Sequence, residues 1–383
     1  MITTDRELRK LINKINSKTV TTLAIDTEFY WRYSYYPQLC LIQIATRDNS
    51  IYLIDTLAKI DLAILQPIFS NPLICKIMHA ACNDIKILKH YVNATFNNIF
   101  DTQIAMAFLG YPHQMSLQKV LETLNLFNLD KQEKMSDWRL RPLTKTQIAY
   151  AKADVTYLHS TYTLLKSKLS AIQHDQFFSE DMDKICKNTS FTRADEAHLL
   201  FYSQLCHLHG KTYSYVKALA IWREYYAQKK NWTVQHIFSD KELLKIAHLH
   251  LDSEESLSES QIFSDKKLQC YGKLILKALE NSEKVDTFNI EQNKIYYPNV
   301  DRKCITEAFQ ILKILANQKK IAIATICSKR DLIKFMQSYL QDPKNLKGKL
   351  SSGWRFNLFG YKILEFLNAI PNFYKAISTS LDN

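Results

Sequence analysis

Five short apolar runs in the first 160 residues limit what this chain can fold into more than any other feature does. They cover residues 21–28, 39–45, 50–55, 74–78 and 99–101. Segments with the period of a helix lie between them, at 62–69, 83–91 and 105–109. Strands that alternate with helices are typical of an α/β domain, and three strands in succession predict a mixed sheet. We therefore expect a mixed sheet flanked by helices in residues 1–170, with Asn83 as the N-cap of the second helix.

The rest of the chain has helical rather than strand periodicity. Residues 171–196 are polar and mixed in charge, which predicts a linker. Helical segments follow over residues 197–285 and again over 296–383, and we expect two all-α domains. Residues 252–260 (DSEESLSES) lack periodicity and predict an exposed loop or a helix-cap region.

The composition is that of a soluble globular protein. Hydrophobic residues make up 46% of the chain and charged residues 23%. The first 20 residues have no apolar core of a signal peptide, and they predict an amphipathic helix with Leu8, Leu11, Ile12 and Ile15 on one face. The eight cysteines form no C-x-x-C pair. We expect reduced thiols, no zinc site, no membrane association and a cytoplasmic protein, with a monomer favoured.

The net charge of +12 favours a nucleic-acid partner, although a basic surface also serves solubility alone. Residues 1–160 hold 18 basic and 14 acidic side chains, so their net charge is +4. The remaining 32 basic and 24 acidic side chains give residues 161–383 a net charge of +8. This distribution suits a basic binding region attached to a catalytic domain.

Two acids end the first strand. Asp26 and Glu28 are two residues apart, so their side chains share one face of the strand. Like charges at that spacing repel each other unless a cation lies between them, and Mg²⁺ or Mn²⁺ prefers carboxylate oxygens. The alternative is a solvated strand end.

Three further residues complete an acidic constellation. Asp84 follows the strand at 74–78, where an aspartate is also an ordinary capping residue. Tyr150 and Asp154 lie four residues apart in TQIAYAKADVTYL, one turn apart on the same helix face. They could instead be a core aromatic and a surface acid, but Asp154 then stands unexplained among small apolar side chains.

In this order, the motifs resemble those of the DEDD exonuclease superfamily in its tyrosine-bearing branch. The segment IDTEFYWRYSYYPQLCLIQIA resembles the first exonuclease motif of the ribonuclease D family, and KIMHAACNDIKIL resembles the second. The stretch LDKQEKMSDWRLRPLTKTQIAYAKADVTYL is similar to the third. Residues 20–165 carry the strong likeness. The segments YVKALAIWREYYAQKKN and SSGWRFNLFG look, more loosely, like two helical domains of the helicase-and-ribonuclease-D C-terminal (HRDC) type.

The resemblance implies a ribonuclease H-like exonuclease domain that trims RNA from the 3′ end with two divalent cations, Mg²⁺ or Mn²⁺. By resemblance, Asp26, Glu28 and Asp154 would hold the cation that binds the attacking water. Asp26 would bridge to the second cation, with help from Asp84, and Tyr150 would orient the water. The implied substrate is RNA such as the 3′ ends of tRNA precursors, and the implied products are nucleoside 5′-monophosphates.

Several other side chains are candidates for RNA contact. Candidates to line the substrate site are Thr27, Phe29, Gln43, His79 and Asn83. Lys131, Arg139 and Arg141 precede the third motif and either contact phosphates or are solvated. The chain has no phosphate-binding glycine motif, so no nucleotide cofactor is expected. A DNA 3′→5′ exonuclease and a non-catalytic RNA-binding scaffold remain the alternative functions.

Overall fold

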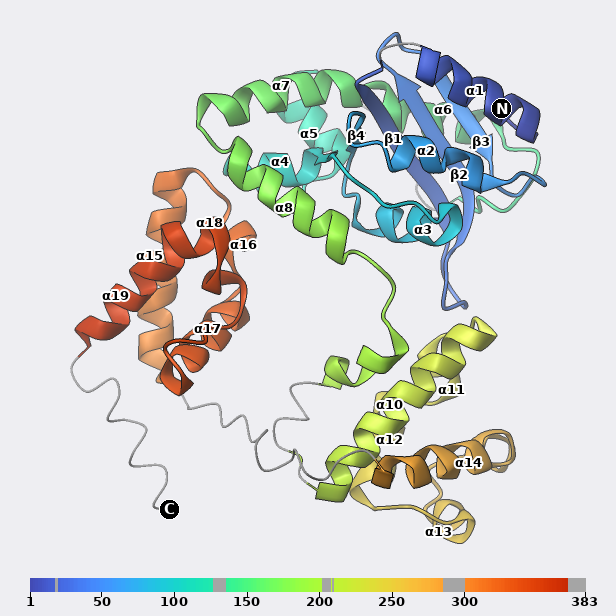
Figure 1. The fold of residues 1–383 in the computed structure, drawn as a ribbon, viewed down its shortest axis with the longest axis vertical. Helices are drawn as coiled ribbons and strands as arrows, with labels where there is room; N and C mark the ends of the chain where they lie inside the picture. The colour runs from blue at the N-terminus through green and yellow to red at the C-terminus, as the bar shows by residue number, and fades with distance from the viewer. Residues whose placement is uncertain (18–19, 127–135, 202–207, 209, 285–299, 371–383) are drawn as a thin grey trace. The chain divides into compact units, whose positions relative to one another are not determined.

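The computed structural model describes residues 1–17, 20–126, 136–201, 208, 210–284 and 300–370 (Figure 1). The chain falls into two compact units. The first combines Met1–Tyr30, Leu39–Ser190 and Tyr297–Asn383, and the second combines Trp31–Gln38 with Phe191–Tyr296. None of the helices in these described ranges is both long and apolar enough to cross a bilayer.

A five-stranded sheet organises the first unit. Its strands are β1 Thr22–Tyr30, β2 Gln38–Thr46, β3 Ile51–Asp55, β4 Cys75–Met78 and β5 Ile99–Asp101. The order across the sheet is β3-β2-β1-β4-β5. Strands β2 and β3 pair antiparallel, while β4 pairs parallel with both β1 and β5. The predicted mixed sheet is confirmed, and the strand that carries Asp26 is its central strand.

Helices flank this sheet, as predicted. Their bounds are α1 Asp5–Ser17, α2 Gln66–Phe69 after the 3₁₀ turn η1 Leu62–Leu65, α3 Cys82–Val92, α4 Thr102–Phe108, α5 Leu117–Thr123, α6 Lys145–Thr156 and α7 Leu158–Ala171. The apolar face predicted for the N-terminal helix is confirmed, since Leu8, Leu11, Ile12 and Ile15 are buried in α1. Helix α6 packs against β1 and β3, and α7 packs against β1 and β4.

The segment expected to be a linker contains a helix, α8 Asp175–Asn188. Phe178, Met182 and Cys186 are buried on it at intervals of four residues. The Phe178 ring lies 4.7 Å from that of Phe100 in β5, measured between centroids. The polar composition of 171–196 conceals this apolar stripe, which joins the helix to the core of the α/β domain.

The C-terminal helices belong to the same compact unit as the sheet. They are α15 Arg302–Lys319, α16 Ile323–Ile326, α17 Lys329–Gln341, the 3₁₀ turn η5 Lys349–Ser351, α18 Gly353–Arg355, the π-helical turn η6 Phe356–Gly360 and α19 Tyr361–Ala369. The Trp354 ring packs against Phe108 of α4 and Phe177 of α8, with centroid distances of 5.3 and 5.5 Å. One continuous hydrophobic core therefore runs from the α/β domain into this helical module.

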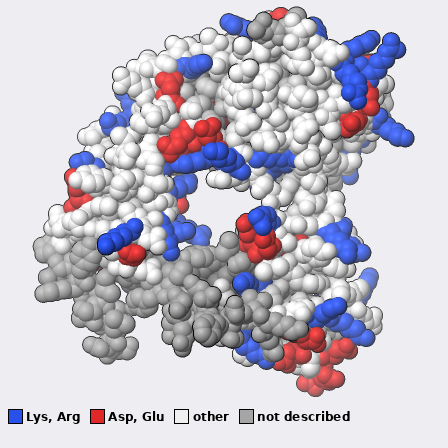
Figure 2. Space-filling view, in the orientation of Figure 1, with Lys and Arg blue, Asp and Glu red and all other residues white. Residues whose placement is uncertain are grey.

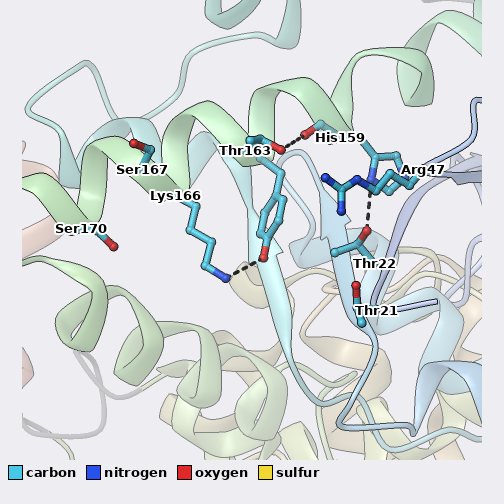
Figure 3. Close-up of a pocket in the computed structure, with 9 residues that line it drawn as sticks. Thr21, Thr22, Arg47, His159, Thr163, Lys166, Ser167 and Ser170 are labelled. Carbon is cyan, nitrogen blue, oxygen red and sulfur yellow. Dashed lines mark hydrogen bonds between the residues drawn. The ribbon is translucent and has the colours of Figure 1, made fainter. Parts of the chain in front are cut away.

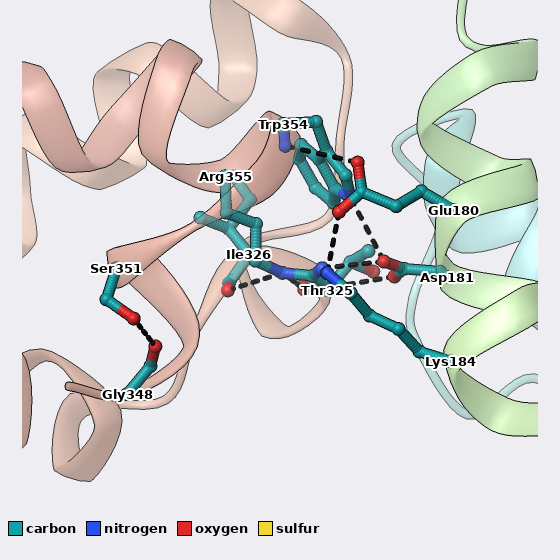
Figure 4. A network of polar contacts seen from close by, with 9 residues as sticks. All are labelled: Glu180, Asp181, Lys184, Thr325, Ile326, Gly348, Ser351, Trp354 and Arg355. Atoms are coloured by element: carbon teal, nitrogen blue, oxygen red, sulfur yellow. Dashed lines mark hydrogen bonds and ion pairs between the residues drawn. The ribbon is translucent and has the colours of Figure 1, made fainter. Parts of the chain in front are cut away.

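A buried polar network fastens the two parts of this core together (Figure 4). The Arg355 guanidinium donates to both carboxylate oxygens of Asp181 in α8, each at 2.6 Å. The indole Nε1 of Trp354 donates to the same carboxylate at 3.0 Å. Arg355 also donates to the carbonyls of Thr325 and Ile326, so one side chain ties α8 to α16 and α18.

The second unit is helical. Its elements are η2 Ala194–Phe201, α10 Gly210–Lys230, α11 Val234–Ile237, α12 Asp240–His248, α13 Glu254–Glu259, α14 Asp265–Glu280 and η3 Asn281–Lys284. The short stretch 31–38 joins it, because the Tyr35 hydroxyl donates to Glu224 of α10. Residues 252–260 contain α13, which begins at a capping box formed by Ser253 and Ser256. The predicted helix-cap region is therefore confirmed, and the alternative of an exposed loop is wrong.

Basic side chains lie over both units on the visible face, interspersed with acidic ones (Figure 2). The charge is therefore not confined to the helical modules, and the α/β domain carries part of the basic surface itself.

Candidate active site

Three carboxylates meet where β1 faces α6. Asp26, Glu28 and Asp154 each offer an oxygen, and these oxygens lie within 4.8 Å of one another. The two-residue spacing on β1 brings the first two to the same side, and α6 brings the third. That helix begins at a capping box in which Thr144 and Gln147 satisfy each other's backbone N–H groups.

The fourth acid, Asp84, is buried in the first turn of α3. The hydroxyl of Thr27 donates a hydrogen bond to the Oδ1 of Asp84. Thr27 lies between Asp26 and Glu28 in β1, so this bond links α3 to that strand. Helix α3 begins at Cys82 with Ala81 as its N-cap, so the prediction that Asn83 caps this helix is wrong. Asn83 lies within the first turn, exposed, beside Asp84.

Asp101 at the end of β5 positions this turn, a role that sequence reasoning missed. Its carboxylate accepts from the backbone N–H groups of Ala80 and Ala81 at 3.1 and 2.8 Å. It also caps α4 by accepting from Gln103 at 2.8 Å. Ala80 has a left-handed φ of 56°, a costly conformation for alanine that the Asp101 hydrogen bonds hold in place. An aspartate between a strand and a helix predicts a helix cap from the sequence. The hydrogen bonds that Asp101 accepts from Ala80 and Ala81 depend on the fold.

The acids oppose one another electrostatically when no cation is bound. Burial raises the pKa of Asp26 well above its ordinary value, and the charges of Asp84, Asp154 and Glu28 raise it further. Burial also raises the pKa of Asp84 to about 7, although the hydrogen bond from Thr27 acts in the opposite direction. Clustered carboxylates with raised pKa values suit hard divalent cations, which supply the missing positive charge.

Metal affinity is expected to rise with pH between 6 and 8. A cation binds the ionised carboxylates, and in the metal-free protein the raised pKa values of Asp26 and Asp84 keep protons on them toward neutral pH. Each proton released on binding steepens the dependence by up to about tenfold per pH unit. Calorimetry with Mg²⁺ or Mn²⁺ at pH 6, 7 and 8 measures this, with Asp183→Asn on the exposed side of α8 as the control. An affinity that stays constant over this range contradicts the expectation.

Tyr150 lies one turn from Asp154 on α6, as its spacing predicts. Its ring is 6.0 Å from that of Trp138, measured between centroids, at the edge of a small apolar cluster. Burial raises the pKa of Tyr150, and the charges of Asp154, Glu28 and Asp26 raise it further. The phenol therefore keeps its proton at neutral pH and serves as a hydrogen-bond donor.

Comparison with known proteins agrees with this geometry. Residues 1–170 match the family described as 3′-5′ exonuclease, and residues 214–279 match the HRDC domain. Ribonuclease D of Desulfotalea psychrophila is 30% identical over 359 residues, which cover 93% of this chain and 95% of that protein. The chain belongs to the ribonuclease D family.

Two further ribonuclease D proteins support the assignment. That of Bartonella henselae is 30% identical over 379 residues and is covered to 90% of its length. The crystal structure of Escherichia coli RNase D, described as an exoribonuclease involved in structured RNA processing, superposes with a TM-score of 0.84. Its identity is 25%, and the match covers 97% of this chain and 99% of that one. The chain is thus a hydrolytic 3′→5′ exoribonuclease of the ribonuclease D type, in a fold class that depends on divalent metal ions.

The residues expected to line the ribonuclease D substrate site have different surroundings. Thr27 is buried and engaged with Asp84, while Phe29 is half-buried near the end of β1. Asn83 is exposed, so its amide is accessible to a ligand. Their contacts with RNA stay predictions.

Gln43 and His79 lie deeper. Gln43 is fully buried in β2, and neither atom of its amide has a hydrogen-bond partner among the residues that the structure describes. This position leaves Gln43 no surface on which to contact RNA directly. The ring nitrogens of His79 lie 2.8 Å from the Thr102 hydroxyl and 3.0 Å from the Met115 carbonyl. These contacts fix the ring beside the turn that leads to Asp84.

The arginines before the third ribonuclease D motif have protein partners. Arg141 donates to both oxygens of Asp55, at 2.6 and 2.7 Å, and to the carbonyls of Cys40 and Trp138 at 2.8 Å each. Arg139 pairs with Asp137 and lies 3.6 Å over the Tyr30 ring. Neither is simply a solvated charge, and Arg141 anchors the segment that carries Trp138. Lys131 lies outside the described residues.

Replacing Arg141 by Lys is expected to destabilise the α/β domain by about 1–3 kcal/mol, because an ammonium group cannot span Asp55 and two carbonyls at once. Urea denaturation measures the change. Arg6→Lys, at an exposed position on α1, is the matched control and is expected to unfold like wild type. Equal midpoints for Arg141→Lys and wild type would show that the anchor contributes nothing to stability.

Proposed function

We propose that this enzyme trims the 3′ ends of structured RNAs such as tRNA precursors, using two divalent cations and releasing nucleoside 5′-monophosphates. The cluster of Asp26, Glu28 and Asp154, with Asp84 joined to it through Thr27, is the observation that carries the proposal. Four carboxylates suit two cations, because their charges cancel. The description of the E. coli enzyme supports structured RNA as the substrate class.

The carboxylates divide the work of holding these cations. Asp26, Glu28 and Asp154 would hold one, and Asp26 with Asp84 would hold the other. When bound, the cations supply Lewis acidity that activates water, neutralises the phosphate oxygens and stabilises the leaving 3′ oxygen. Tyr150 keeps its proton, and its hydroxyl would donate a hydrogen bond to the attacking water and so orient it. The Thr27 hydroxyl holds the Asp84 carboxylate close to β1, and Asp101 holds the turn that precedes α3.

The seven cysteines among the described residues are free thiols, most of them buried. This supports a reducing compartment, and we place the enzyme in the cytoplasm.

The test is hydrolysis of a 3′-extended tRNA with Mg²⁺ or Mn²⁺, and then with EDTA. Stepwise shortening from the 3′ end, with nucleoside 5′-monophosphates identified by chromatography, is expected with either metal and is expected to stop in EDTA. A DNA strand of the same sequence is the comparison substrate, and faster hydrolysis of the DNA would overturn the choice of RNA. Tight RNA binding without hydrolysis under any metal condition would favour a scaffold.

A further inference from the structure

A polar pocket lies at the start of β1, before the strand reaches Asp26 and Glu28 (Figure 3). Its volume is about 470 Å³. Thr21 and Thr22 at the start of β1 and Arg47 after β2 form one wall. Asp26 is four residues along the strand from Thr22, a distance of about 13 Å at the rise of a β-strand.

One face of helix α7 forms the other wall. The lining positions His159, Thr163, Lys166, Ser167 and Ser170 follow one another at intervals of four, three, one and three residues. Intervals of three and four residues place side chains on one helix face, and Figure 3 shows His159 directed toward Thr22 and Arg47. Apart from the ring of Tyr162, the lining side chains on this face are hydroxyls, an imidazole and an ammonium group.

The pocket is rich in hydrogen-bond donors. The exposed guanidinium of Arg47 finds no acceptor among the residues that the structure describes, which leaves five N–H groups for a ligand. Lys166 bonds the Tyr162 hydroxyl at 3.0 Å, and this bond raises the pKa of Lys166. Two positive charges thus lie at the pocket, and its nine lining residues include no carboxylate.

His159 connects α7 to the ends of β1 and β2 through hydrogen bonds and adds no third positive charge to the pocket. Its Nε2 lies 3.1 Å from the Ala45 carbonyl, which accepts, and its Nδ1 lies 3.4 Å from the Thr22 hydroxyl. Burial lowers the pKa of His159, and the charge of Arg47 lowers it further, so the ring is neutral at pH 7. The His159 ring thus holds Thr22 and the end of β2 against α7.

The hydroxyls differ in availability. Thr163 donates to the His159 carbonyl at 3.0 Å. Ser170 donates to Asp175 at 2.9 Å, which places one carboxylate beside the pocket. The side-chain hydroxyls of Thr21 and Ser167 have no hydrogen-bond partner within the described part of the chain, so both are available to a ligand.

We propose that this pocket binds a backbone phosphate of the RNA, upstream of the nucleotide being removed. A phosphodiester offers acceptor oxygens and a negative charge, which match unpaired Arg and hydroxyl donors. The inference rests on RNA being the substrate. Free phosphate has the same chemistry, but an RNA chain presents a phosphate at every nucleotide.

The test compares RNA binding by wild type and the double variant Arg47→Gln/Lys166→Gln in EDTA, where no hydrolysis occurs. Fluorescence anisotropy gives Kd for a 3′-extended tRNA and for a dinucleotide, whose single phosphodiester cannot reach both the acids and the pocket. The affinity for tRNA divided by the affinity for the dinucleotide is expected to be about tenfold lower in the variant than in wild type. The slope of log affinity for tRNA against log salt concentration is expected to be shallower by about 1 for each cation removed. Lys168→Gln, two residues away on α7, is the matched control and is expected to bind like wild type.

Several results would overturn the proposal. An unchanged affinity ratio in the double variant, or an equal fall in Lys168→Gln, would show an ordinary solvated helix face. Calorimetric binding of inorganic phosphate that the double variant loses, with tRNA affinity retained, would assign the pocket to free phosphate. Because these measurements need no turnover, a failure of tRNA hydrolysis would count against the proposed function and leave the binding result standing.

Discussion

Replacing Asp26 by Asn is expected to lower the rate of RNA hydrolysis by about 10³-fold or more at saturating Mg²⁺. Asp26 lies centrally in the cluster, since its carboxylate interacts with Asp84, Asp154 and Glu28. Metal stabilisation of the transition state is worth several kcal/mol, and each 1.36 kcal/mol lost is a factor of ten. The measurement is the initial rate of 3′ shortening of a labelled RNA. Asp183→Asn, an exposed acid on α8, is the control and is expected to retain full activity.

The same variant has a stability signature that is independent of activity. Because burial and the neighbouring acids raise the pKa of Asp26 in the folded state, its charged form destabilises the fold as pH rises through that pKa. In EDTA at pH 8 the Asn variant is therefore expected to melt at a higher temperature than wild type. Added Mg²⁺ is expected to raise the Tm of wild type and to raise that of the variant much less. A variant that melts lower in EDTA and responds equally to Mg²⁺ contradicts the assignment of Asp26 as a metal ligand.

Replacing Arg355 by Met is expected to destabilise the first compact unit by about 3–5 kcal/mol. The substitution leaves the buried carboxylate of Asp181 without its partner and removes the hydrogen bonds to the carbonyls of Thr325 and Ile326. Guanidinium denaturation followed by tryptophan fluorescence measures the loss, because Trp354 lies in the same network (Figure 4).

Two further variants make this result interpretable. Lys362→Met breaks an exposed ion pair with Glu365 on α19 and is expected to unfold like wild type. The double variant Asp181→Leu/Arg355→Met removes both charges and is expected to recover part of the stability. A single variant as stable as wild type would show that the helical module docks without this pair.

Local sequence patterns account for two pairs of residues within the proposed catalytic constellation. Asp26 and Glu28 share a face because a strand repeats every two residues, and Tyr150 lies near Asp154 because a helix repeats every 3.6. The apolar run at residues 39–45 predicts β2 because a strand that is buried on both faces is continuously apolar. Resemblance to known exonuclease motifs then predicted that these strands and helices bring their acids together in one site.

Long-range packing decided what the local patterns could not. Helix α8 has the composition of a linker, and its core position depends on Phe178 meeting Phe100 far away in the chain. Arg141 is one of several basic residues before the third motif, and only the position of β3 supplies Asp55 as its partner.

The sequence by itself therefore determined the α/β class and the strands, because each depends on spacing within one element, whereas the set of acids with their tyrosine was predicted from resemblance to known exonuclease motifs. The tertiary structure alone decided that Thr27 and Asp101 hold the Asp84 turn, that Gln43 is buried, and that Arg355 joins the last helical module to α8. Those contacts join residues far apart in the chain, and their energies depend on burial and geometry, which no local pattern encodes.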